Sequence, residues 1–258
     1  MKILVCVKRV PAPGSRINLT ADERAIDTAH LGFTTSPHEE CAVEAAAQLI
    51  EAHGGTATVL TIGPQESAEQ LRYAVSVGMT AAVLVPTDGG EWDPQRTAAA
   101  ITTVVRQLEA DGEPFDLILF GNESADSGGF QVGIRVAVAL GRPIVNGAKA
   151  LEITDGARGV VHVQRESDAG RETYELPLPA AVGVKEGINL PRYPTMKGRL
   201  ASKRVEVARL ELDAPEGGLR MVRLRRPPER VSATVVLGHG PEAAPAVVDL
   251  LTELGVLT

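Results

Sequence analysis

Short apolar runs alternate with amphipathic stretches along the first 140 residues. Buried strands are predicted by β-branched apolar runs at 2–8, 56–62, 81–86 and 116–120. Between these runs, apolar residues recur every three or four positions, which predicts helices that begin near 37, 64, 94 and 131. Such an alternation of strands and helices is typical of a parallel sheet with helices on both faces.

The pattern changes its period after Pro143. Residues 159–165 and 172–176 alternate between apolar and polar side chains, which predicts an antiparallel hairpin added to the sheet. Residues 180–185 predict one more buried strand. The fold class is therefore α/β: an open, mostly parallel, Rossmann-like sheet with flanking helices, an antiparallel hairpin and a C-terminal arm.

Beyond Gly187 the chain no longer has the pattern of a domain core. Residues 189–230 contain several prolines and eleven Lys or Arg against five Asp or Glu, a net charge of +6 in a chain whose total is −7. A basic, proline-rich segment on an acidic domain predicts an arm that lies on a partner protein, with a solvated loop as the alternative. We therefore divide the chain into an α/β domain, 1–187, and a partner-docking loop and arm with a terminal helix, 188–258.

Composition and charge exclude several classes of function. The chain has 258 residues, eight aromatic side chains and a net negative charge, which argues against nucleic acid as a partner. Its two cysteines and five histidines have no disulfide or metal-ligand spacing. The first apolar run is too short for a signal peptide, and no stretch approaches the length of a membrane span. We expect a cytoplasmic protein without direct membrane insertion.

Candidate chemistry lies where the predicted parallel strands end. In open α/β sheets, ligands bind beyond the carboxyl ends of the strands. The glycine-rich stretch 121–131 follows one such strand and begins a helix, so its backbone N–H groups can bind a phosphate; a helix-entry turn without a ligand is the alternative. The stretch GHGPEA at 238–243 matches a dinucleotide motif, but too few residues follow for a βαβ unit. No catalytic constellation stands out, so the sequence favours binding over turnover.

Four stretches contain more specific motifs: ILVCVKRVP at 3–11, SPHEECAVEAA at 36–46, the passage 165–182, and NLPRYPTMKGRL at 189–200. In these stretches, and over essentially its full length, the chain resembles the beta subunit of electron transfer flavoprotein. The stretch at 189–200 is the most specific of the four. The resemblance implies the adenine nucleotide alpha hydrolase-like form of the Rossmann-like fold.

The resemblance also implies an electron carrier subunit that is not an enzyme by itself. In this family the alpha subunit holds FAD, and the beta subunit extends an arm around it and buries an AMP that is not turned over. Electrons pass from flavin dehydrogenases, commonly the acyl-CoA dehydrogenases of fatty acid beta-oxidation, to a quinone oxidoreductase. Two alternatives remain: an electron-bifurcating flavoprotein with a second FAD in this subunit, and a stand-alone nucleotide-hydrolysing or adenylating enzyme.

Carried over by position, the implied nucleotide site comprises Cys6, Ser36, Pro37, His38, Glu39, Ile62, Gly121, Asn122, Glu123, Ser124, Ala125, Asp126, Ser127, Gly128, Gly129, Phe130, Gln131 and Val132. The implied dehydrogenase-docking residues are Tyr193, Met196 and Lys197, with Met196 as an apolar anchor in an exposed loop. Glu166 matches a family glutamate at the subunit interface near the flavin. For Met196 the alternative is packing on its own domain, and for Glu166 it is a plain position on the hairpin surface.

Overall fold

A computed structural model describes residues 1–154, 159–228 and 234–257. The chain forms two compact units, Met1–Val222 and Arg223–Thr258, which are described separately. The first unit extends beyond residue 187, because the segment that follows packs on the α/β domain. The functional division expected at residue 187 stays a prediction.

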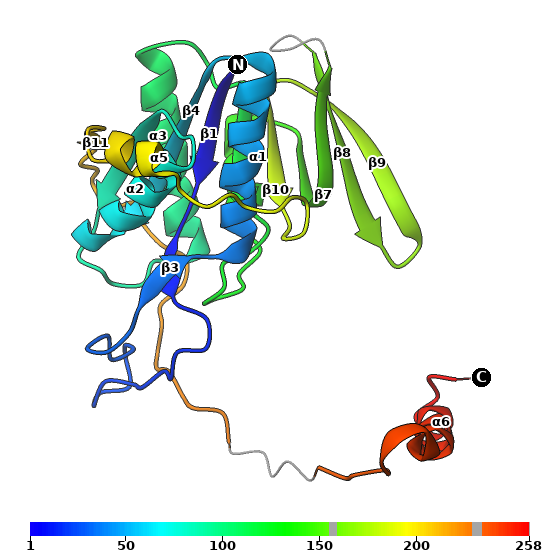
Figure 1. Ribbon diagram of the computed structural model, residues 1–258. Coiled ribbons are helices and arrows are strands. Elements are labelled where there is room, and N and C mark those ends of the chain that lie inside the picture. Colours follow the sequence, from blue (N-terminus) through cyan, green and yellow to red (C-terminus); the bar gives the residue numbers. More distant parts are fainter. Residues whose placement is uncertain (155–158, 229–233, 258) are drawn as a thin grey trace. The chain divides into compact units, whose positions relative to one another are not determined.

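A nine-stranded sheet forms the centre of the first unit (Figure 1). Its strand order is β11-β5-β4-β1-β6-β10-β7-β8-β9, and the strands from β11 to β7 run parallel. Strands β8 and β9 complete one edge as an antiparallel hairpin, as the sequence predicts. The strands are β1 (Lys2–Cys6), β4 (Thr56–Gly63), β5 (Ala81–Pro86), β6 (Leu117–Gly121), β7 (Ile144–Thr154), β8 (Val160–Ser167), β9 (Gly170–Pro177), β10 (Ala180–Val184) and β11 (Val207–Arg209).

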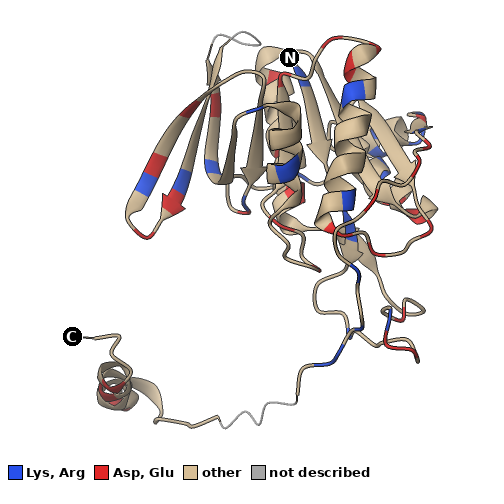
Figure 2. Ribbon diagram, turned by 180° about the vertical axis from the view of Figure 1, so that it is seen from behind, with Lys and Arg blue, Asp and Glu red and all other residues tan. Residues whose placement is uncertain are grey.

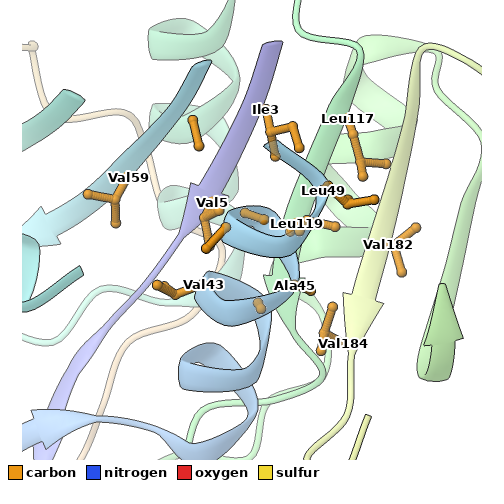
Figure 3. Close-up of a cluster of buried hydrophobic side chains, with 14 of the residues drawn as sticks. Ile3, Val5, Val43, Ala45, Leu49, Val59, Leu117, Leu119, Val182 and Val184 are labelled. Carbon is orange, nitrogen blue, oxygen red and sulfur yellow. The ribbon is translucent and has the colours of Figure 1, made fainter. Parts of the chain in front are cut away.

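Helices cover both faces of the parallel part, because its strands are apolar on both sides. In β1, Ile3 and Val5 face one cluster of buried side chains, whereas Leu4 and Cys6 face the other. The first cluster includes residues of α1 and α2, and Figure 3 shows α1 lying against β1, β6 and β10. The second cluster includes residues of α3 and α4. The helices are α1 (Pro37–His53), α2 (Ala68–Ser76), α3 (Pro94–Ala110) and α4 (Val132–Leu140), with a short 3-10 turn, η1 (Gln65–Ser67), before α2.

Strand β7 was not predicted, and it joins the hairpin to the parallel sheet. Its alternation is interrupted at Asn146-Gly147, where Gly147 has φ +77° and the register with β10 shifts, and again between Ala148 and Ala150, where the register with β8 shifts. A β-bulge breaks the alternation of apolar and polar side chains, so the sequence pattern does not predict this strand. A separate two-stranded ribbon, β2 (Arg9–Pro11) with β3 (Phe33–Thr35), was also missed, because each strand is only three residues long.

The segment 188–202, called the docking segment below, crosses α1 and ends in a further helix, α5 (Met196–Ser202), beside α2 (Figure 1). The sequence predicts a loop here, and this prediction is wrong for residues 196–202. Thr195 begins the helix by accepting a hydrogen bond from Gly198 N at 3.0 Å. A Cβ on Gly198 would lie 2.1 Å from Ser76 O, so only glycine allows α5 to approach α2 this closely.

The last residues of the first unit are held at the start of α3. One oxygen of Asp93 caps α3 by accepting a hydrogen bond from Arg96 N at 2.8 Å. The other accepts a hydrogen bond from Leu219 N, also at 2.8 Å. The chain therefore leaves the first unit from a fixed position.

The second unit contains η3 (Gly240–Ala243) and the terminal helix α6 (Ala244–Glu253), which the sequence predicts. Apolar side chains on and beside α6 are exposed, among them Val248, Leu254 and Val256. Within the described residues, no helix is both long enough and apolar enough to cross a membrane.

Candidate nucleotide site and docking segment

The candidate nucleotide site lies where the strand order reverses. From β1, the sheet extends through β4 and β5 in one direction and through β6 and β10 in the other. The carboxyl ends of β1 and β6 are therefore neighbours, with Cys6 opposite Phe120 in the register. A crevice outside this point is the usual ligand position in an open α/β sheet.

The first turn of α1 is packed closely against the end of β6. A Cβ on Gly121 would lie 2.6 Å from Glu39 Cγ and 3.3 Å from His38 Cβ, so the strand must end in glycine. His38 Nδ1 accepts a hydrogen bond from Glu186 N at 2.8 Å, which ties the same turn to the residues after β10. Three separate strand ends and one helix start thus meet at this position.

Glu39 is a buried carboxylic acid between β1 and α1. Its Oε2 accepts hydrogen bonds from Lys8 N at 3.0 Å and from Ser36 N at 3.3 Å. Burial raises the pKa of Glu39 to about 8, although the two amides and the Lys8 charge act in the opposite direction. With this pKa, the Glu39 side chain is mainly protonated at neutral pH.

Lys8 joins the end of β1 to the glycine-rich loop. Its Nζ lies 2.7 Å from Asp126 Oδ2 and 3.1 Å from Glu91 Oε1. Burial alone would lower the pKa of Lys8, but the two carboxylates outweigh it and the pKa is raised. The pKa of Asp126 is lowered, because the Lys8 charge and hydrogen bond outweigh the effect of burial. This ion pair fixes one side of the loop.

The rest of the loop is shaped by its own hydrogen bonds and by two residues with positive φ. Ser124 Oγ and Ser127 Oγ lie 2.8 Å apart, and Gly128 N donates to Ser124 O at 2.9 Å. Gly128 and Phe130 both have φ +55°, which turns the chain into α4. Arg135 N donates to Gln131 O as α4 begins, so the preceding amides of this helix have no acceptor within the helix.

Asn122 Oδ1, directly after β6 and beside Gly147 of β7, and Thr61 Oγ1, near the end of β4, are buried and have no hydrogen-bond partner among the described residues. Buried polar atoms are nearly always paired, so the Asn122 oxygen requires a donor and the Thr61 hydroxyl a donor or an acceptor, from a ligand or from water. The chemistry of these groups suits a nucleotide, whose amine and hydroxyl groups are donors and whose phosphate is an acceptor for the amides that begin α4. The described residues contain no group of three or more His, Cys, Asp or Glu that could hold a metal ion.

The implied nucleotide-site residues lie in neighbouring segments of this edge of the sheet. Cys6 ends β1, 36–39 begin α1, Ile62 lies at the end of β4, and 121–132 connect β6 to α4. Lys8 ends the predicted strand 2–8, and Thr61 lies near the end of the predicted strand 56–62. Both therefore lie at strand ends where the sequence predicts ligands, although neither is among the residues that the resemblance implies. Glu91 was not predicted.

The implied partner residues lie elsewhere in the first unit. Tyr193 and Met196 are 89% and 75% exposed, and Lys197 is also exposed. Met196 is therefore not a buried gap-filling side chain in this chain. Glu166 is exposed on β8, opposite Arg171 of β9, in a hairpin whose charges are visible in Figure 2.

Comparison with known proteins agrees with this architecture. Residues 25–215 match the family model described as electron transfer flavoprotein domain. The chain is 32% identical to the electron transfer flavoprotein subunit beta of Bacillus subtilis, with 97% of each chain covered. It is 34% identical to the protein of the same description from Syntrophomonas wolfei, covering 90% of this chain and 88% of the relative. The corresponding protein of Megasphaera elsdenii is 30% identical, with 98% and 97% covered.

The chain thus belongs to the electron transfer flavoprotein family, as one of its beta subunits. The resemblance stated from the sequence motifs is confirmed. Membership implies a flavoprotein complex and an alpha-subunit partner.

Proposed function

We propose that this subunit binds one AMP in the crevice between β1 and β6, without converting it. The observation that supports this best is the unpaired, buried Asn122 Oδ1 in the same β6–α4 connection whose last residues begin α4 with free amides. Cys6, Ile62 and the first turn of α1 form the rest of the proposed site. Nothing here combines a nucleophile with an orienting base, so a stand-alone hydrolysing or adenylating enzyme has less support than a carrier subunit.

Local charge favours AMP over a second FAD. Lys8 is already paired with Asp126 and Glu91, and Glu123 lies in the same loop, with its Oε1 3.9 Å from His38 Nε2. These carboxylates repel a pyrophosphate more strongly than a single phosphate. The electron-bifurcating alternative, with FAD in this site, requires two phosphates to be held mainly by backbone amides.

The proposed complex contains an FAD-carrying alpha subunit, and that FAD supplies the redox chemistry when bound. This chain contributes the structural nucleotide, the arm that lies on the alpha subunit, and the docking segment. Tyr193, Met196 and Lys197 contact a flavin dehydrogenase, for example an acyl-CoA dehydrogenase of beta-oxidation. The complex lies in the cytoplasm and passes its electrons to a quinone oxidoreductase, and Glu166 lies at the subunit interface.

The nucleotide content of the purified complex tests the proposal. Denaturation should release one AMP and one FAD per heterodimer, measured by chromatography against standards. Release of two FAD and no AMP would instead identify the bifurcating alternative.

A variant in the loop tests the location of the site. Gly129→Val adds bulk beside Pro94, whose Cγ is 3.8 Å from the position of the first added carbon, and should lower the AMP content and the yield of heterodimer. Gly32→Val is a matched control, because its added carbon is 3.7 Å from Ala12 Cβ in a loop outside the crevice. Full AMP content in Gly129→Val would contradict this location.

A further inference from the structure

The docking segment is fastened to α1 by an arginine with several partners. Arg192 Nε and Nη2 donate to the two carboxylate oxygens of Glu44 at 2.8 and 2.9 Å. Its backbone N also donates to Glu44 Oε2, at 3.1 Å. Glu51, two turns further along α1, accepts from both Nη1 and Nη2. This bidentate geometry fixes the direction of the segment as well as its distance from α1.

The two glutamates differ in burial, and this difference shows which of them contributes more to holding the docking segment. The side chain of Glu44 is only 4% exposed, whereas that of Glu51 is 62% exposed. A carboxylate at the Glu44 position requires a charged partner, because burial without one is costly. The exposed Glu51 contact is screened by solvent and adds little. The Glu44–Arg192 pair is therefore the main fastening.

Neighbouring contacts hold the segment on both sides of Arg192. Upstream, Asn189 Nδ2 donates to Cys41 O of α1 at 3.0 Å. Downstream, Gly198 packs against Ser76, as described above, and Arg72 Nη1 donates to Ser202 O at 3.3 Å. The segment is thus fixed to α1 at its start and to α2 at its end.

Between these contacts with α1 and α2, the segment exposes several large side chains to solvent. Leu190 and Tyr193 are each 89% exposed, Met196 is 75% exposed and Leu200 is 56% exposed. Four large, exposed apolar or aromatic side chains on a fastened backbone are typical of a surface organised before its partner arrives.

We propose that Arg192, bound to the buried Glu44, is a positioning residue that orders the docking segment before a dehydrogenase binds. This inference rests on the proposed function, in which Tyr193 and Met196 contact that partner. Without the Glu44–Arg192 pair, the docking segment samples other conformations. The apparent affinity for the dehydrogenase then falls in proportion to the fraction of molecules whose segment is in the binding conformation. The effect appears in the KM for the carrier and leaves turnover at saturation unchanged.

The test compares variants in the purified heterodimer with a purified acyl-CoA dehydrogenase and its acyl-CoA substrate. Arg192→Lys keeps the charge and loses the bidentate geometry. The double variant Glu44→Gln/Arg192→Gln removes both charges, so no unpaired buried carboxylate threatens folding. For both, we expect a rise in KM for the carrier of about tenfold, with kcat within about twofold of wild type, which corresponds to about 1.4 kcal/mol. Hydrogen exchange of amides 189–202 should become faster in the absence of dehydrogenase.

Arg142→Lys provides the matched control. Arg142 makes a similar pair with Glu109 and donates to Phe115 O at 3.0 Å, away from the docking segment. It should lower stability without changing KM or the exchange of 189–202. A change in KM equal to that of Arg192→Lys would mean that general destabilisation is responsible, and would overturn the inference.

Met196→Ala separates the failure of this inference from failure of the proposed docking site. If Met196→Ala raises KM while both Arg192 variants leave KM and exchange unchanged, the docking site stands and the positioning role is overturned. If Met196→Ala and the Arg192 variants all leave KM unchanged, the proposed docking site fails and the inference fails with it.

Discussion

Replacement of Glu39 by glutamine should remove a loss of folding stability that the first unit undergoes as pH rises. The carboxylic acid is 6% exposed and accepts hydrogen bonds from two backbone amides. Glutamine has nearly the same shape and can accept the same bonds through its oxygen, but it does not titrate. The comparison therefore isolates the cost of ionising this position.

The sign of the effect follows from the raised pKa of Glu39. In the unfolded chain its pKa is near the ordinary 4.5, whereas in the fold it is about 8. Between these values the folded state keeps a proton that the unfolded state has released, so stability falls as pH rises. The stabilisation by the protonated acid is fully present below about pH 4.5 and lost above about pH 8. With about 1.36 kcal/mol for each pKa unit, the whole change is at most about 5 kcal/mol.

Urea unfolding of the nucleotide-free chain from about pH 5 to about pH 9 measures this difference. We expect Glu39→Gln to match the wild type near pH 5 and to be more stable by several kcal/mol near pH 9. Glu51→Gln is the control. The Arg192 hydrogen bond lowers the pKa of Glu51, so the contribution of Glu51 to stability changes only at acidic pH. A constant difference between Glu39→Gln and wild type across the range would refute the reasoning.

Three further predictions concern close packing and docking. Gly121→Ala places a Cβ 2.6 Å from Glu39 Cγ and 3.2 Å from Glu39 N, and should cost about 1–3 kcal/mol in urea unfolding; an unchanged midpoint would contradict this. Met196→Ala should weaken dehydrogenase docking by about 1–3 kcal/mol while the flavin spectrum and subunit assembly stay unchanged. Equal reduction rates at every carrier concentration would show that Met196 is not the anchor. Lys197, next to Met196 in the chain, and Lys203, directly after α5, are exposed, so reduction at low carrier concentration should become slower as salt rises from about 0.05 to about 0.5 M, and no salt dependence would argue against a charged rim.

Most of the α/β domain could be predicted from the sequence. Its parallel strands are uniformly apolar, and apolar residues recur every three or four positions in its helices. The strands at β1, β4, β5 and β6 and the helix that begins after Ser36 all follow from local pattern. The elements that were missed depend on distant contacts. Helix α5 contains Gly198, an unfavourable helix residue, and forms where α2 offers Ser76. Strand β7 is interrupted by its own bulge.

The candidate site could be predicted as a position but not as a set of interactions. The order of strands and helices places 121–132 at a strand end, and the motif resemblance adds the first turn of α1. Pairing of Lys8 with Asp126 joins residues far apart in sequence, and nothing local indicates it. The burial of Glu39 likewise depends on how closely Gly121 approaches.

Helix α1 contacts both the proposed nucleotide site and the docking segment, and this affects how variants in the helix should be interpreted. Its first turn lies at the proposed nucleotide site, while Cys41, Glu44 and Glu51 hold the docking segment. A substitution that loosens this one helix can therefore lower nucleotide retention and partner recognition together. An electron-transfer assay alone therefore does not distinguish the two defects in a variant within residues 37–53. Measurement of AMP content and of carrier KM on the same preparation separates a damaged crevice from a displaced docking segment.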